Sequence, residues 1–253
     1  MKSIIIILFL SVSFLSAAQL TNQPVIDIHL HAYEGLPPNE LSSWAGEPYA
    51  KSLKSPQNAL DHLKVVLQEI DKNNIKLALI SSTSVQALEN WKKERPGLFL
   101  TGVQTNRGKP ILTPDSLKLY FDNKKVDFLG ELGLQYFGIK PDDPMLNPYY
   151  RVAEDNRIPV CLHTGLGPPG MPHSMAPDFR TTLGKPTLFE PVLVKHPKLR
   201  AFIAHAGYPF ISETIAMMYI YPNLYADIGV LAWALPKEAY YRTIKQLIDA
   251  GFG

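Results

Sequence analysis

Seven short apolar runs rich in Ile, Val and Leu recur along this chain, and segments of helical period separate them. The runs are VIDIHLH (25–31), IKLALIS (75–81), LFLTGVQ (98–104), FLGELGLQY (128–136), PVCLHTG (159–165), RAFIAHAG (200–207) and NLYADIG (223–229). Strands that alternate with helices are typical of a parallel sheet covered by helices. This rhythm predicts an α/β fold, which is either a (β/α)8 barrel of the TIM type or an open doubly wound sheet.

Polar side chains at the ends of several strands discriminate between these two architectures. His29, His31, Glu131, His163 and His205 all fall toward the carboxyl ends of different predicted strands. Barrel enzymes distribute their functional groups over many strand ends in this way, whereas an open sheet concentrates its site at one switch point. The chain also contains no G-x-G-x-x-G or P-loop motif, which disfavours a nucleotide-binding sheet. The barrel is therefore the predicted fold.

The His-x-His pair in the first run is the strongest chemical signal. On a strand, His29 and His31 lie on the same face, about 7 Å apart along the backbone. Two neutral imidazoles at this spacing can converge on one metal ion. Any one of these histidines alone would be read as a polar cap of a buried strand, but the pair together with His163 and His205 predicts a metal site.

Several phrases of the sequence resemble one known family. DIHLH opens the first run, GELGLQY the fourth, IPVCLHTG the fifth and FIAHAG the sixth, and HPKLRAFIAHAG and YPNLYADIG fit the same pattern. Together they resemble the amidohydrolase superfamily, whose members are metal-dependent hydrolases built on a (β/α)8 barrel. The chain looks closest to the branch called amidohydrolase family 2, which includes decarboxylases related to aminocarboxymuconate-semialdehyde decarboxylase. The resemblance covers nearly all of the chain from Val25 to Gly253.

This resemblance implies a role for each candidate residue. His29, His31 and His163 would be ligands of a divalent metal, with zinc favoured over manganese or iron. His205 would bind a second metal or act as the catalytic acid/base. Glu131 would either bridge two metals, as in relatives resembling the TatD nucleases, or orient a ligand histidine. The resemblance therefore leaves open whether one ion or two would bind.

The resemblance also implies an aspartate at the end of an eighth strand, in a phrase such as FGSD. The sequence printed here ends at YYRTIKQLIDAGFG, where a family member would continue into that strand. We therefore expect a chain truncated before its last barrel strand. Asp227 is the nearest available carboxylate, but the resemblance does not make it a metal ligand.

The function that this resemblance implies is hydrolysis of an amide, ester or lactone bond in a small organic substrate by a metal-activated water. Two alternatives remain: a non-oxidative decarboxylase on the same barrel, and a metal-binding protein without catalytic activity. The Pro- and Gly-rich loop after His163 would help to build the substrate pocket. His173 and Arg180 in this loop are candidate substrate contacts, and Arg180 would suit a carboxylate.

The N-terminus predicts export from the cytoplasm. Lys2 precedes an apolar stretch, and the small residues Ser16, Ala17 and Ala18 follow it, as in a secretory signal peptide. The apolar stretch is shorter than the roughly 20 residues that span a bilayer. We expect residues 1–18 to be the signal peptide, residues 19–253 to form the barrel domain, and the mature protein to be periplasmic or secreted.

The composition adds little about partners beyond a small-molecule substrate. A formal net charge of +2 gives no reason to expect nucleic acid binding, and a homo-oligomer remains possible. The single cysteine, Cys161, leaves no internal disulfide and is predicted to be a small buried side chain. His196 in KHPKLR is predicted to lie at the surface or in a loop.

Overall fold

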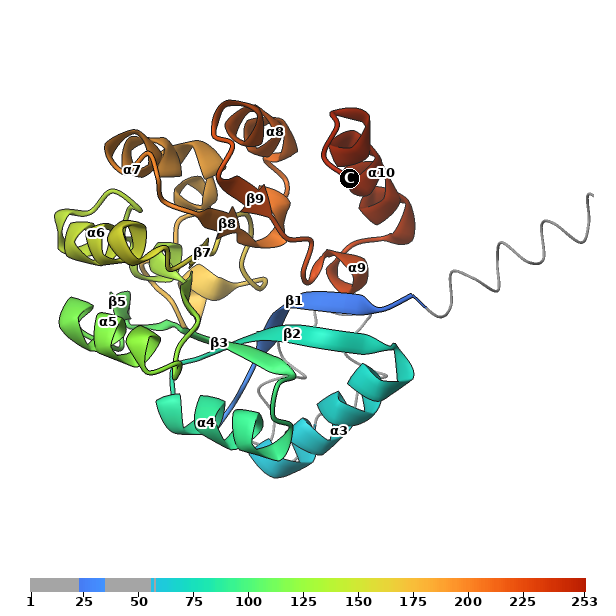
Figure 1. The fold of residues 1–253 in the computed structure, drawn as a ribbon. Helices are drawn as coiled ribbons and strands as arrows, with labels where there is room; N and C mark the ends of the chain where they lie inside the picture. Colours follow the sequence, from blue (N-terminus) through green and yellow to red (C-terminus); the bar gives the residue numbers. More distant parts are fainter. Residues whose placement is uncertain (1–22, 35–55, 57) are drawn as a thin grey trace, which may run out of the picture.

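One curled, seven-stranded parallel sheet forms the centre of the protein (Figure 1). The computed structural model describes residues 23–34, 56 and 58–253. The strands are β1 (Val25–His31), β2 (Ile75–Ser82), β3 (Phe99–Val103), β6 (Phe128–Leu132), β7 (Val160–Leu162), β8 (Ala201–Ile203) and β9 (Leu224–Ala226), paired in that order. The seven predicted strands are confirmed. Within the described ranges, β1 and β9 are the two edges of the sheet, with no eighth strand between them.

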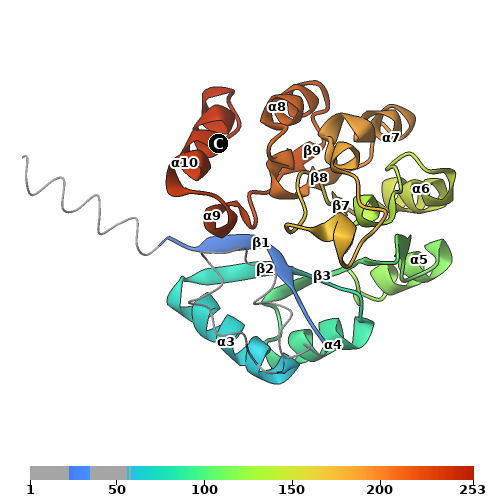
Figure 2. The same ribbon diagram turned by 180° about the vertical axis from the view of Figure 1, so that it is seen from behind.

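Helices surround the outside of the curled sheet, as both ribbon views show (Figures 1 and 2). They are α3 (Ala59–Lys72), α4 (Val85–Glu94), α5 (Pro114–Asp122), α6 (Asn147–Asn156), α7 (Glu190–Lys195), α8 (Ile211–Ile220), α9 (Leu231–Ala234) and α10 (Lys237–Asp249). Side-chain caps start several of them. Thr113 Oγ1, for example, accepts a hydrogen bond from the Ser116 backbone N–H, and Pro114 occupies the first turn of α5.

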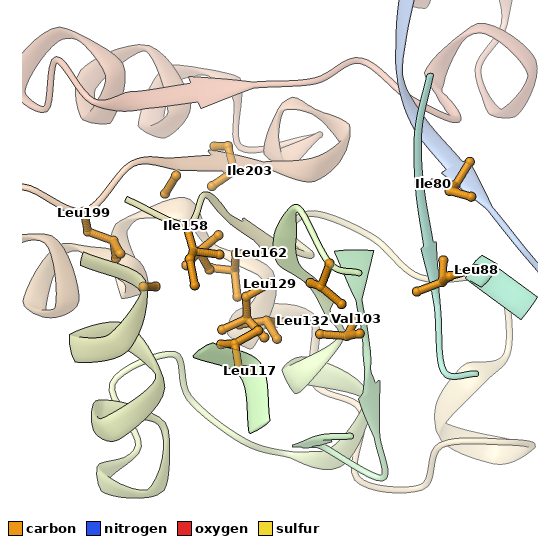
Figure 3. Close-up of a cluster of buried hydrophobic side chains, with 14 of the residues drawn as sticks. Ile80, Leu88, Val103, Leu117, Leu129, Leu132, Ile158, Leu162, Leu199 and Ile203 are labelled. Carbon is orange, nitrogen blue, oxygen red and sulfur yellow. The ribbon is translucent and has the colours of Figure 1, made fainter. Parts of the chain in front are cut away.

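The main hydrophobic core lies between the sheet and these helices. Figure 3 shows part of it, with side chains from the strands packed against side chains from the helices and the chain segments beside them. Ile80, Leu129 and Ile203 of the strands are fully buried, as are Leu88 of α4 and Leu117 of α5. Each such side chain contributes about 1.5–3 kcal/mol by leaving water. The core therefore fixes the positions of the strands, and with them the positions of the strand ends.

A second, smaller cluster fills the inside of the curl. It consists of Phe128, Cys161, Phe202 and Ala204, with Leu79 packed against it. Cys161 is 2% exposed, which confirms that it is a small buried side chain. The interior of the curl is thus packed rather than hollow, as in barrels of this size.

One polar network links helix α4, the segment after α5 and strand β3. The ammonium group of Lys92 in α4 donates hydrogen bonds to Thr101 Oγ1, to the Lys124 carbonyl and to Asp127 Oδ2. Asp127 Oδ2 also accepts from the Thr101 backbone N–H at 2.8 Å. These contacts hold α4 and the segment after α5 against β3.

Several predicted strands end earlier than the sequence suggested, and a 3-10 helix follows two of them. The strand predicted to run to Tyr136 stops at Leu132, and a 3-10 helix, η2 (Leu134–Phe137), follows it. The strand predicted to run to Gly207 stops at Ile203, before η7 (Ala204–Gly207). The remaining short elements are an antiparallel pair, β4 (Thr105–Asn106) and β5 (Lys109–Pro110), and η3 (Pro144–Leu146), η4 (Met171–His173), η5 (Thr181–Gly184) and η6 (Pro186–Phe189). Because the chain turns at these strand ends, side chains there are brought over the end of the sheet.

The predicted signal peptide, residues 1–18, and the first residues of the predicted domain lie outside the described residues. In the part of the chain that the structure describes, none of the helices has the length and apolar character needed to cross a membrane.

Candidate metal centre

Four histidines gather around one glutamate at the carboxyl end of the sheet. His29 and His31 come from β1, and Glu131 comes from β6. His163 directly follows β7, and His205 lies in η7, two residues after the end of β8. The Nε2 atoms of His29 and His31 lie 3.7 and 3.5 Å from Glu131 Oε2. Those of His163 and His205 lie 3.9 and 3.4 Å from Oε1. The structure therefore brings these five sequence-predicted residues together.

The opposite ring nitrogens of two histidines are held by acceptors. His29 Nδ1 lies 2.9 Å from Asp227 Oδ2, and His205 Nδ1 lies 2.9 Å from the Gly229 carbonyl. A carboxylate and a carbonyl can only accept, so each Nδ1 carries the proton that it donates. In the neutral imidazoles, Nε2 then presents a lone pair toward Glu131, which is the form that a metal ligand or a base requires.

Asp227 links the first strand to the last and was not assigned a role from the sequence. Its carboxylate is buried, at 2% exposure. Besides binding His29, it accepts hydrogen bonds through Oδ1 from the backbone N–H groups of His205, at 2.9 Å, and Gly229, at 2.8 Å. His205 has a φ of 61°, an unfavourable value for a residue with a side chain. The hydrogen bond that Asp227 accepts from the His205 backbone therefore helps to hold this strained conformation, which sets the direction of the His205 ring.

Gly229 approaches the site too closely for any side chain. A Cβ atom at this position would lie 2.6 Å from Cγ of His29 and 2.8 Å from its Cβ. This contact explains why a glycine lies two residues after Asp227. The closeness also lets the Gly229 carbonyl reach the His205 ring.

His31 is oriented by two residues that the sequence analysis did not single out. Its Nδ1 lies 3.0 Å from the Ser81 hydroxyl and 2.8 Å from the Gln104 amide, and Gln104 also donates to Ser81. Ser81 lies near the end of β2, and Gln104 directly follows β3. Ser81 and Gln104 are polar residues at strand ends, so the reasoning that located the histidines would have identified them as well.

The charges in the cluster are strongly coupled. Burial opposes a charge on His29, but the hydrogen bond to Asp227 and the charge of Glu131 outweigh it and raise the pKa of His29 to about 9. Desolvation outweighs the attraction of Glu131 for His31 and His163, and lowers their pKa values to about 4 and about 3. Although burial works against it, the surrounding imidazoles hold the pKa of Glu131 well below its usual range.

The residues present fit a divalent metal. His29 Nε2 and Glu131 Oε1 are buried and have no hydrogen-bond partner in the protein. Unpartnered polar atoms in such positions are costly unless they bind a ligand. Imidazole and carboxylate together suit zinc, and also manganese and iron. Three groups have ligand atoms close enough to share an ion: His29–His31–Glu131, His29–His205–Asp227 and Glu131–His163–His205.

The two predicted substrate contacts lie apart from this cluster. His173 is an exposed residue of η4. Arg180 is also exposed, and its guanidinium donates to the backbone carbonyls of Pro177 and Phe179. The structure therefore gives neither side chain a contact with the histidines, and their role in substrate binding stays a prediction.

Comparison with known proteins identifies the family. The model of the amidohydrolase family matches residues 26–251, nearly the whole described chain. The protein therefore belongs to the amidohydrolase family, a family of metal-dependent enzymes that act on small molecules. This finding confirms the resemblance seen in the sequence.

Solved structures confirm the TIM-barrel type of fold. An uncharacterized TIM-barrel protein from Bordetella bronchiseptica is 19% identical, with a TM-score of 0.60 over 87% of this chain and 80% of that one. A probable 2-pyrone-4,6-dicarboxylic acid hydrolase from Acinetobacter baumannii is 13% identical, with a TM-score of 0.58 over 91% and 80%. A 5-carboxyvanillate decarboxylase from Novosphingobium aromaticivorans with bound manganese is 12% identical, with a TM-score of 0.53 over 79% and 70%. At these identities the likeness concerns the fold.

A curated relative matches over a shorter stretch. The protein fluG from Emericella nidulans is 23% identical over 99 residues, which are 39% of this chain. The match spans only 10% of that protein's length.

Proposed function

We propose that this protein is a metal-dependent hydrolase that cleaves an amide, ester or lactone bond in a small organic substrate. The observation that carries the proposal is the ring of four imidazoles whose Nε2 atoms lie 3.4–3.9 Å from the Glu131 carboxylate. A divalent ion held there supplies a Lewis acid and lowers the pKa of water to about 7. In this proposal His29, His31 and His163 hold the ion.

His205 is the proposed acid/base. Its Nδ1 proton is fixed on the Gly229 carbonyl, so Nε2 is free to take a proton in the neutral ring. The imidazolium that forms lies 3.4 Å from Glu131 Oε1, whose negative charge stabilises it. The ring can then return the proton to the leaving group, as hydrolysis requires.

Glu131 lies at the centre of the cluster, and both of its proposed roles are consistent with that position. As a ligand it would contribute its carboxylate directly. As an orienting residue it would hold the Nε2 atoms of neighbouring rings toward the same point. The number of ions bound per chain separates these roles, since a bridging carboxylate implies two ions.

A non-oxidative decarboxylase is the second candidate. The fold match to a manganese-containing decarboxylase has a TM-score of 0.53. It supports the decarboxylase candidate as well as the match to a probable hydrolase supports the hydrolase candidate. Here the same histidines would hold the ion, and His205 would deliver a proton to the carbon that loses carbon dioxide. In both candidates Arg180 is the proposed contact for a substrate carboxylate.

The first experiment is elemental analysis of the purified protein after reconstitution with zinc, manganese or iron. We expect one or two equivalents per chain, lost in His29→Ala and retained in His62→Ala, which removes a histidine outside the cluster. Absence of bound metal from a folded wild-type protein would contradict the proposal. The loaded protein is then assayed on small esters, amides and lactones, including 2-pyrone-4,6-dicarboxylic acid, and on phenolic carboxylic acids with detection of carbon dioxide. Turnover that releases carbon dioxide would replace the hydrolase proposal with the decarboxylase.

We further propose that the protein is exported and acts in the periplasm or outside the cell, on the basis of the signal-like sequence at residues 1–18. N-terminal sequencing of the protein recovered from the periplasm tests this proposal. A mature N-terminus at Gln19 is expected, and recovery of uncleaved protein from the cytoplasm would contradict it.

A further inference from the structure

The hydroxyl of Tyr136 reaches a proposed metal-binding atom directly. It lies in η2, the 3-10 helix that replaces the predicted end of the fourth strand. Its phenolic oxygen is 3.0 Å from His163 Nε2. The same nitrogen is the one directed at the cluster, 3.9 Å from Glu131 Oε1.

The ring of Tyr136 is held in this position from both sides. It packs edge-on against the His163 ring, with 4.9 Å between centroids, and against Phe179 on the other side at 5.4 Å. Phe179 belongs to a small buried cluster with Met171 and Ala176, in the loop that follows β7. The hydroxyl contact with His163 is therefore fixed by packing and is not an incidental approach of a mobile side chain.

The hydrogen bond and a metal ion require the same atom. Nε2 of His163 has one lone pair or one proton, so it cannot bond to Tyr136 and bind an ion at the same time. Its other nitrogen, Nδ1, is buried and has no hydrogen-bond partner. His163 differs in this respect from His29 and His205, whose Nδ1 atoms are held by acceptors that leave Nε2 free.

We propose that Tyr136 is a positioning residue that occupies His163 Nε2 in the metal-free protein and competes with the ion for it. This inference rests on the proposed metal centre. When the ion binds His163, the Tyr136 hydroxyl is released beside the centre, where it can donate a hydrogen bond to an oxygen of the substrate. The loop after β7 thereby acts on the site through Phe179 and Tyr136.

Zinc titration against a competing chelator tests the inference in the full chain. Tyr136→Phe removes the hydroxyl and keeps the ring between His163 and Phe179. Since a neutral hydrogen bond contributes about 0.5–1.5 kcal/mol, the variant should bind zinc roughly 2- to 12-fold more tightly than wild type. Tyr150→Phe is the control, because Tyr150 is a buried tyrosine whose hydroxyl donates a single hydrogen bond, to the Pro141 carbonyl.

Gain of affinity distinguishes this role from a structural one, since a damaged site would bind zinc less tightly. Unchanged or weaker binding in Tyr136→Phe would overturn the inference while leaving the metal centre intact. Failure of the wild type to bind zinc would overturn the metal centre itself, and with it this proposal. Phe179→Leu provides a second variant. It loosens the ring without removing the hydroxyl, and we expect a smaller gain of affinity, in the same direction.

Discussion

Replacing Asp227 with asparagine tests whether this carboxylate sets the protonation of the metal centre. The substitution keeps the side-chain shape, and its remaining oxygen can still accept from the backbone N–H groups of His205 and Gly229. Toward His29, however, an NH2 group replaces the acceptor Oδ2. His29 Nδ1 must then accept, and its proton moves to Nε2, the nitrogen that faces Glu131.

The main expected effect of Asp227→Asn is a lower affinity for the metal. Loss of a partner that orients a ligand histidine typically weakens metal affinity 10- to 100-fold, which corresponds to about 1.4–2.8 kcal/mol. Zinc dissociation constants are measured by chelator competition for the wild type, Asp227→Asn and Asp227→Ala. The alanine variant also loses the acceptor for two backbone N–H groups, so it should be less stable than Asp227→Asn as well as weak in binding zinc.

Comparison of the two variants separates orientation from folding. Without metal, we expect Asp227→Asn to be less stable than the wild type, because it loses the charged partner of His29, but more stable than Asp227→Ala. It should bind zinc at least 10-fold more weakly than the wild type. If Asp227→Asn binds zinc as tightly as the wild type, the protonation state of His29 is not set by Asp227. The argument from the 2.9 Å contact would then be refuted.

Two further predictions concern stability. In the metal-free protein, the pKa of His29 is raised from 6.5 to about 9. Between these pH values the folded state keeps a proton that the unfolded state has lost, so stability should fall as pH rises from 6.5 to 9. The pKa values of His31 and His163 are lowered to about 4 and about 3. Below pH 6.5 the unfolded state therefore binds more protons than the folded state, so stability should also fall as the pH is lowered from 6.5. Urea unfolding at a series of pH values checks both limbs, and a curve without a maximum near pH 6.5 would contradict the assignment. Separately, Lys92→Met should lower the free energy of unfolding by about 1–2 kcal/mol. It removes the charged donor from the Lys124 carbonyl and from Asp127, which keeps only its hydrogen bonds from Thr101, at a partly exposed site. An unchanged urea midpoint would show that the Lys92 contacts contribute nothing to stability.

The strands and most of the metal centre could be predicted because their signals are local. Alternation of apolar and polar residues placed His29 and His31 on one face, and the end-of-strand positions placed Glu131, His163 and His205 beside them.

What the sequence could not show depends on contacts between distant segments. His196 was expected at the surface or in a loop. It does lie just after α7, outside the helix, but it is 5% exposed, and its ring nitrogens lie 3.1 Å from Glu154 and Asn147. These partners lie 42 and 49 residues away. Tyr136 was placed in a strand, and its contact with His163 depends on the turn into η2.

The hydrogen bond between His29 and Asp227 joins positions 198 residues apart, one in the edge strand β1 and the other directly after the edge strand β9. Contacts between such distant positions form late in folding, because the chain between them must first become ordered. We expect the centre to become competent for metal only after the first and last strands have docked, so metal uptake would report completion of the fold rather than formation of any single βα unit. The same contact links the two edges of the sheet. A bound ion that strengthens this contact would slow the separation of the two edges.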